Sequence, residues 1–190
     1  MTAITISRQM GCQGAEVARL TAEICGYSRA WREIINQAAF RSGRPEMALA
    51  HLDELGLLDV CPSPEDCLAY TQAINQVVSE LAQAGNVVIV GRAGQAILHD
   101  WPDVLHVRII APLETRARRI AGQHGISLAG AYAQIEASDE YRRAYLERYY
   151  HQDWENPALY DLILNTERLT PPRAAEIIAA ALARLVGAPA

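Results

Sequence analysis

The stretch Ile4-Thr-Ile-Ser-Arg-Gln-Met-Gly-Cys-Gln-Gly-Ala-Glu-Val-Ala18, near the start of the chain, decides the expected fold. Its first residues are apolar and rich in β-branched side chains, which predicts a strand over residues 3–7. A polar turn with two glycines follows, and we expect a helix from Ala15 with Gly26 as its stop. A strand, a glycine-bearing turn and a helix in direct succession form the opening of a βαβ unit.

The turn between this strand and this helix is a candidate phosphate-binding loop. Backbone N–H groups at a helix N-terminus point into one concavity, and the helix dipole adds positive potential there. The loop does not match the pattern GxxxxGK[ST], because Gly14 stands where lysine is required. An ordinary βα turn is the alternative interpretation. The residues expected to surround a phosphate are Ser7, Arg8, Gly11, Cys12, Gln13, Gly14, Ala15 and Glu16.

The cations of the chain are all arginine, seventeen in number, and there is no lysine. Biased codon usage explains this composition, but it has a chemical consequence: phosphate must be bound by arginine, backbone N–H groups or metal. Arg8, directly after the strand, is therefore expected to replace the missing positive charge. Glu16 is favoured in the first turn of the helix by the dipole alone, and a ligand of Mg²⁺ is its second interpretation.

The remaining pattern predicts an α/β fold. Further strands are expected over 87–90, 104–110 and 160–164. Helices are expected over 31–40, 47–58, 65–84, 113–124 and 128–150, and from Thr170 onward. Apolar strands that alternate with helices indicate a parallel sheet between two helical layers, a three-layer α/β/α arrangement. A length of 190 residues fits a single domain over 1–190.

Arginines recur at expected strand ends and helix faces. Arg92 follows the apolar strand 87–90, where ligands of open α/β sheets bind. Arg116 and Arg119 are three residues apart and share a helix face, so both can converge on one anion. Asp139 and Arg142 share a face in the same way. A solvated ion pair explains each pair taken singly, but not their joint occurrence beside a phosphate-type loop.

Composition limits the remaining classes of function. No apolar run is long enough to span a bilayer, and the N-terminus is typical of a strand rather than a signal peptide, so we expect a cytoplasmic protein. The net charge of −5 argues against a broad nucleic-acid-binding surface. The four cysteines have no CxxC spacing, which predicts reduced thiols rather than a zinc site.

Six segments together resemble the cytidylate kinase-like family, which is similar to the nucleoside monophosphate kinases and has the P-loop fold. They are Ile4-Thr-Ile-Ser-Arg-Gln…Gly, Gly26-Tyr27…Arg32-Glu-Ile-Ile35, Val88-Ile-Val-Gly-Arg92, Ala111-Pro-Leu-Glu-Thr-Arg116, Asp153-Trp…Asn156-Pro and Tyr160-Asp-Leu-Ile-Leu-Asn-Thr166. The resemblance spans nearly the whole chain. It implies a five-stranded parallel core, a helical insertion at about 28–64 that binds the nucleoside monophosphate, and an arginine-bearing lid at about 120–150.

The same resemblance implies roles for individual residues. Arg32 and Arg92 would hold the acceptor monophosphate, and Asp139 would order the lid. Arg116, Arg119 and Arg142, the residues that we expect to be catalytic together with Arg8, would gather over the transferred phosphoryl group. The family carries glycine where this chain has Gly14, but it has small residues in place of Cys12 and Gln13.

The expected activity is ATP-dependent phosphorylation of a nucleoside monophosphate, with Mg²⁺ as cofactor and nucleoside mono- and triphosphates as partners. Trp31 replaces an acidic residue of the family, which bears on the acceptor. Two alternatives stay open: a nucleotide-binding regulatory protein without turnover, and a kinase of another small acceptor. An aromatic stretch, Tyr145, Tyr149, Tyr150 and Trp154, makes a homodimer a further hypothesis.

Overall fold

The computed structural model describes residues 2–43 and 63–187 of the chain. The strands are β1 (Ala3–Arg8), β2 (Ser28–Ala30), β3 (Val87–Val90), β4 (Val104–Ile110) and β5 (Leu162–Asn165). The helices are α1 (Gly14–Cys25), α2 (Arg32–Arg41), α4 (Pro64–Ala84), α5 (Gly94–Ile97), α6 (Leu113–His124), α7 (Leu128–Tyr150) and α8 (Pro171–Gly187), with a short 3₁₀ helix η1 (Pro157–Leu159). The helix expected over 47–58 lies outside the described residues.

The five strands form one sheet in the order β2-β3-β1-β4-β5, and every neighbouring pair is parallel. The expected five-stranded parallel α/β fold is therefore confirmed. The residue pattern alone indicated only four of these strands. β2 is three residues long and two of them are exposed, so it has no apolar run by which a pattern can reveal it.

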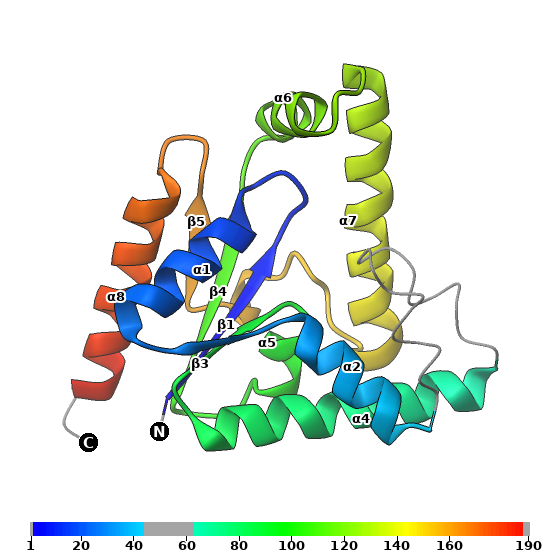
Figure 1. The fold of residues 1–190 in the computed structure, drawn as a ribbon, viewed down its shortest axis with the longest axis vertical. Helices are drawn as coiled ribbons and strands as arrows, with labels where there is room; N and C mark the ends of the chain where they lie inside the picture. The colour runs from blue at the N-terminus through cyan, green and yellow to red at the C-terminus, as the bar shows by residue number, and fades with distance from the viewer. Residues whose placement is uncertain (1, 44–62, 188–190) are drawn as a thin grey trace.

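Side chains alternate between the two faces of the sheet and create two separate apolar layers. On β1, Ala3 packs in one core cluster with α2, α4 and α5, whereas Ile4 and Ile6 pack in the other with α1 and α8. β3 alternates in the same way, because Val87 and Ile89 face the first layer and Val88 and Val90 the second. Figure 1 shows α1 and α8 side by side on one side of the sheet, and α2 and α4 on the other.

The carboxyl ends of all five strands meet at one edge of the sheet. The connections that follow β1, β2 and β3 begin with Gln9, Trp31 and Gly91, so three distant segments of the sequence come together there. β1 lies between β3 and β4, and the chain reverses its direction across the sheet at this strand. The crevice beside such a reversal is where open α/β sheets bind ligands.

One expectation about the cysteines is wrong. Cys67 on α4 is disulfide-bonded, whereas Cys12 and Cys25 are free thiols. Sequence spacing did not indicate this bond, because disulfide pairing depends on the proximity of residues in the folded chain rather than on a local motif. Among the described residues, no helix is both long enough and apolar enough to cross a membrane.

Candidate active site

The loop between β1 and α1 contains two residues with positive φ, Gly11 and Gln13. Gly11 has φ +79°, and a side chain there would lie 2.9 Å from the carbonyl oxygen of Arg116 on α6. Gln13, the residue before α1, has φ 61° and ψ 20°, a left-handed conformation that is uncommon for a residue with a side chain. The loop therefore turns sharply into α1, and the N-terminus of this helix faces the edge of the sheet where the strands end.

The missing lysine has a steric explanation. A Cβ atom at position 14 would lie 2.5 Å from the Cβ of Arg8 and 2.9 Å from its Cγ. The stem of Arg8 thus occupies the space that any side chain at position 14 would need. The far end of Arg8 reaches the turn after β3, since a Cβ at Gly91 would lie 2.3 Å from its Nη1 atom. Arg8 therefore crosses the site from the loop to the end of β3.

A cleft of about 840 Å³ opens in front of the loop. Its lining is strongly cationic, and Glu16 is the only carboxylate among the described residues that line it. The loop contributes Gln9, Met10, Gly11, Gln13, Gly14, Ala15 and Glu16, and the arginines are Arg8, Arg29, Arg32, Arg119 and Arg142. Of the predicted arginines, Arg8, Arg32, Arg119 and Arg142 thus lie together at this cleft, whereas Arg92 and Arg116 are not among its lining residues.

Arg8 is a buried cation among other cations. Burial lowers its pKa to about 9, and the neighbouring charges of Arg142 and Arg92 act in the same direction. Its guanidinium carbon also lies 5.7 Å from the centre of the Trp31 ring. Arg92 and Arg142 have lowered pKa values as well, and burial is the largest cause in both. Three guanidinium groups held close together favour a bound polyanion such as a phosphate group.

Asp139 on α7 links this helix to α6 and, through Arg116, to the loop. Its carboxylate lies 2.7 Å from Nη1 of Arg116 and 3.7 Å from Nη1 of Arg142. Arg116 is buried, and it also donates to the carbonyl oxygens of Ala111 at 3.0 Å and Met10 at 3.3 Å. Arg116 and Asp139 are thus not among the residues that line the cleft, whereas Arg142 is.

Arg119 lies beneath the loop. It donates to the carbonyl oxygen of Gly11 at 3.4 Å and to that of Thr166 at 2.7 Å, and it lines the cleft. Thr166 follows β5, and its hydroxyl donates to the carbonyl oxygen of Cys12 at 2.7 Å. The loop is therefore supported from the end of β5 as well as from α6.

The two residues expected to bind the acceptor monophosphate occupy different places. Arg32 begins α2, lines the cleft, and has its guanidinium carbon 5.4 Å from the centre of the Trp31 ring. Arg92, two residues after β3, has φ 53°, lies near Tyr70 and Tyr145, and is not among the residues that line the cleft. Arg92 is nevertheless close enough to Arg8 to lower the pKa of Arg8.

Two residues of the loop point away from the cleft. The Ser7 hydroxyl accepts a hydrogen bond of 2.9 Å from the indole Nε1 of Trp154, and Ser7 is buried. Cys12 is also buried, and burial raises the pKa of its thiol. The side chains of Ser7 and Cys12 therefore support the loop from within the protein.

The described part of the cleft offers few protein ligands for a magnesium ion. Glu16 lines the cleft, but its two carboxylate oxygens lie 2.6 Å and 3.0 Å from nitrogens of Arg19, and this hydrogen bonding lowers its pKa. The described residues contain no group of three or more histidine, cysteine or acidic side chains that could hold a metal. Mg²⁺ commonly binds through substrate phosphates and one or two carboxylates, so the cleft fits Mg²⁺ only if the nucleotide supplies most of the ligands.

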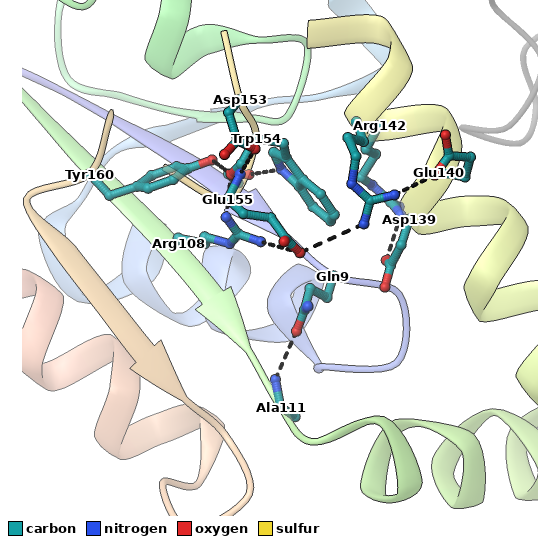
Figure 2. Close-up of polar contacts among 12 residues, drawn as sticks. Gln9, Arg108, Ala111, Asp139, Glu140, Arg142, Asp153, Trp154, Glu155 and Tyr160 are labelled. Atoms are coloured by element: carbon teal, nitrogen blue, oxygen red, sulfur yellow. Dashed lines mark hydrogen bonds and ion pairs between the residues drawn. The ribbon is translucent and has the colours of Figure 1, made fainter. Parts of the chain in front are cut away.

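Several residues of this region were not predicted as site residues. Arg29 and Ser138 line the cleft, and so do Gln123 and His124 at the end of α6. Behind the loop, Arg108 of β4 contacts Trp154 (Figure 2). A signal for Arg108 was present, because it and His106 are the two polar residues in the mainly apolar segment Val104–Ile110. Arg29 gave no such signal, because the residue pattern did not predict the short strand β2 to which it belongs.

Comparisons with known proteins show the family and the fold of this chain. The model of the cytidylate kinase-like family matches residues 3–168. This chain belongs to that family. A cytidylate kinase of Ignicoccus hospitalis is 32% identical over 180 residues, which cover 94% of this chain and 97% of that one. A cytidylate kinase of Pyrobaculum calidifontis is 28% identical over 170 residues, which cover 90% of this chain and 86% of that one.

Solved structures show the same fold at low sequence identity. An uncharacterized protein from Eubacterium ventriosum has a TM-score of 0.75 at 19% identity, and the match covers 96% of this chain and 99% of that one. A shikimate kinase from Bacteroides thetaiotaomicron has a TM-score of 0.55 at 15% identity, with 98% and 99% covered. The expected P-loop kinase fold is thereby confirmed.

Proposed function

We propose that this protein is an ATP-dependent nucleoside monophosphate kinase, with CMP as the first acceptor to test. The observation that carries the proposal is the convergence of Arg8, Arg32, Arg119 and Arg142 on one cleft in front of a glycine-bearing loop. Membership of the cytidylate kinase-like family supports the same class of reaction. Phosphoryl transfer depends mainly on positioning and on neutralisation of charge, and guanidinium groups supply both.

Three of these arginines have a stated part in this mechanism. Arg8 takes the place of the loop lysine as the cation beside the transferred group, since its side chain fills the space next to Gly14. Arg142 brings a second positive charge from α7, and Asp139 orients it. Arg32 is placed to hold the acceptor phosphate. Mg²⁺ carried in with ATP would neutralise further phosphate charge, with Glu16 as the carboxylate among the described residues that line the cleft.

The arrangement of domains follows from the same proposal. The whole chain would act as one domain, in which residues 28–64 bind the acceptor and residues 120–150 form the lid. Of the first segment, β2 and α2 lie within the described residues. Closure of the lid would exclude water and suppress hydrolysis of ATP.

A coupled assay of ADP formation with CMP, dCMP, UMP and AMP tests the proposal. We expect turnover with at least one of them, and turnover lowered at least a hundredfold in Arg8→Gln, because one lost charge contact in a buried site costs about 3 kcal/mol. If no acceptor gives ADP above background, the kinase proposal is wrong. Calorimetric binding of ATP at about micromolar Kd without turnover would instead support the regulatory alternative. Turnover only with acceptors that are not nucleotides would support the other alternative, a kinase of another small acceptor.

A further inference from the structure

Trp154 is a buried side chain that no part of the proposed mechanism uses. It lies between α7 and η1, is 1% exposed, and is not among the residues that line the cleft. Its indole Nε1 nevertheless donates a hydrogen bond of 2.9 Å to the hydroxyl of Ser7. Ser7 directly precedes Arg8 on β1, so this bond holds the start of the phosphate loop from behind.

The core of the protein fixes Trp154 through Arg108 of β4 (Figure 2). The Nη1 atom of Arg108 donates to the carbonyl oxygen of Trp154, and the guanidinium carbon lies 4.5 Å from the centre of the indole ring. The Tyr160 hydroxyl donates to the same carbonyl oxygen at 2.9 Å. Arg108 is itself 4% exposed. Two donors on one carbonyl and a buried cation on the ring leave Trp154 little freedom to move.

Trp154 also contacts the helix that carries the lid arginine. The guanidinium carbon of Arg142 lies 6.0 Å from the centre of the indole ring, at the outer limit of a cation–π contact. Ser138 and Asp139, two other contacts of Arg142, belong to the same helix as Arg142, whereas Trp154 is anchored on the sheet. The neighbouring Glu155 adds a weaker link, since its carboxylate lies 4.0 Å from Arg108 and 3.7 Å from Arg143 of α7.

We propose that Trp154 is a positioning residue: its indole N–H fixes Ser7 at the start of the phosphate loop, and its ring seats Arg142 beside the cleft. One side chain then sets the loop and the lid helix relative to each other. The catalytic part of this inference rests on the proposed kinase function, but its geometric part concerns the free protein alone.

Two substitutions remove the same hydrogen bond from its two ends. Trp154→Phe deletes the donor and keeps an aromatic ring, and Ser7→Ala deletes the acceptor. We expect each to raise the KM for ATP by roughly two- to tenfold, which corresponds to one neutral hydrogen bond. The double variant should be no worse than either single variant, because both lose one bond. Additive effects on KM would overturn the loop half of the proposal.

Trp154→Leu removes the ring as well and tests the contact with Arg142. We expect its kcat to fall roughly a further tenfold below that of Trp154→Phe, with little change in the KM for the acceptor. Trp101→Phe is the matched control and should change neither constant, because Trp101 is a partly buried tryptophan of the core away from the cleft. Equal kcat values for the Leu and Phe variants would overturn the lid half.

A measurement on the free protein keeps the proposal falsifiable if Trp154→Leu does not fold or if the wild type has no turnover. The chain has 3 tryptophans, and their indole N–H signals in an ¹⁵N NMR spectrum are assigned with Trp154→Phe and Trp101→Phe. We expect Ser7→Ala and Arg142→Gln each to shift the Trp154 signal and to leave the Trp101 signal in place. If the chemical shift of the Trp154 indole N–H stays unchanged in both variants, the proposal is wrong. Absence of turnover in the wild type would contradict the kinase function alone.

Discussion

At the scale of single residues, Gly14 and Arg8 form one unit. The glycine leaves the space that the stem of Arg8 fills, since a Cβ at position 14 would lie 2.5 Å from the Cβ of Arg8. Taken alone, a glycine in place of the loop lysine removes a phosphate ligand, and a buried arginine beside other cations is energetically unfavourable. Together they place a planar guanidinium with several N–H donors where the consensus loop has the flexible ammonium group of lysine.

This pairing predicts that restoring the consensus lysine harms the protein. Gly14→Lys must displace the Cβ and Cγ atoms of Arg8, so we expect turnover to fall at least tenfold and the free energy of unfolding to fall by about 1–3 kcal/mol. Urea unfolding and the coupled assay measure both effects. Gly122→Ala is the matched control, because a Cβ there meets no atom within 4 Å, and we expect it to stabilise α6 by about 0.5–1 kcal/mol. An active Gly14→Lys variant of normal stability would contradict the steric account.

The sequence predicted the composition of the cleft better than the direction of each side chain. Of the predicted arginines, Arg8, Arg32, Arg119 and Arg142 line the cleft, whereas Arg92 and Arg116 do not. The side chains of Ser7 and Cys12 are buried as well, because neighbouring loop residues point in different directions and only the packed structure decides which of them face inward. The catalytic and binding roles themselves stay predictions.

At the scale of elements, the loop, α6 and α7 meet through a largely buried ion pair. Arg116 of α6 donates to Asp139 of α7 at 2.7 Å and to the loop carbonyl of Met10 at 3.3 Å. Their side chains are 6% and 13% exposed, so solvent screens this pair weakly. The pair therefore locks three elements that carry residues of the cleft.

Asp139→Asn should consequently be costly. It leaves the buried Arg116 without its carboxylate, and we expect the free energy of unfolding to fall by about 3 kcal/mol. Glu114→Gln on the surface of the same helix pair is the matched control. Glu114 lies 3.1 Å from Arg118, but both side chains are more than 60% exposed, so the expected loss is below about 0.5 kcal/mol. Equal losses in the two variants, measured by urea unfolding, would argue against a locking role for Asp139.

The start of α2 predicts a dependence of stability on pH. Glu33 accepts a hydrogen bond of 3.0 Å from the backbone N–H of Trp31, and this bond is the largest cause of its lowered pKa. A carboxylate with a lowered pKa stabilises the fold above its ordinary pKa, and this stabilisation is lost as the pH falls through the folded-state pKa. Glu33→Gln should therefore cost about 0.5 kcal/mol at neutral pH and less at a pH below the ordinary carboxyl pKa.

Thermal unfolding at the two pH values measures this difference. Glu136→Gln, at an exposed position on α7, is the matched control and should be neutral at both. A Glu33→Gln effect that persists unchanged at low pH would show that the carboxylate charge is not its cause.

Elements with a long apolar pattern were predictable and short ones were not. β1, β3 and β4 are buried along almost their whole length, so apolar and β-branched residues predominate in them. β2 has one buried residue and α5 has four residues in all, so neither carries a periodic signal. Both depend on the rest of the sheet for their stability, which is information that a local window does not contain.

At the scale of the whole molecule, charge is distributed unevenly. The chain has a net charge of −5, yet the described lining of the cleft contains five arginines and a single carboxylate, Glu16, which is paired with Arg19. An acidic protein with one cationic cleft repels anions from most of its surface and attracts them at that place. This pattern selects small polyanions over nucleic acid, which needs a broad basic surface.

This uneven distribution predicts how salt affects catalysis. Raising the ionic strength from about 0.05 M to 0.5 M shortens the Debye length from roughly 14 Å to 4 Å, so the KM for ATP should rise several-fold while kcat changes little.

Arg29 is the most informative position, because it lines the cleft from β2 without a role in the proposed transfer. Arg29→Gln should raise the KM at low salt and flatten the salt dependence. Arg118→Gln removes the same charge from the exposed side of α6, where Arg118 pairs with Glu114, and should leave the slope unchanged. If the two variants gave the same slope, net charge rather than the field inside the cleft would govern ATP capture.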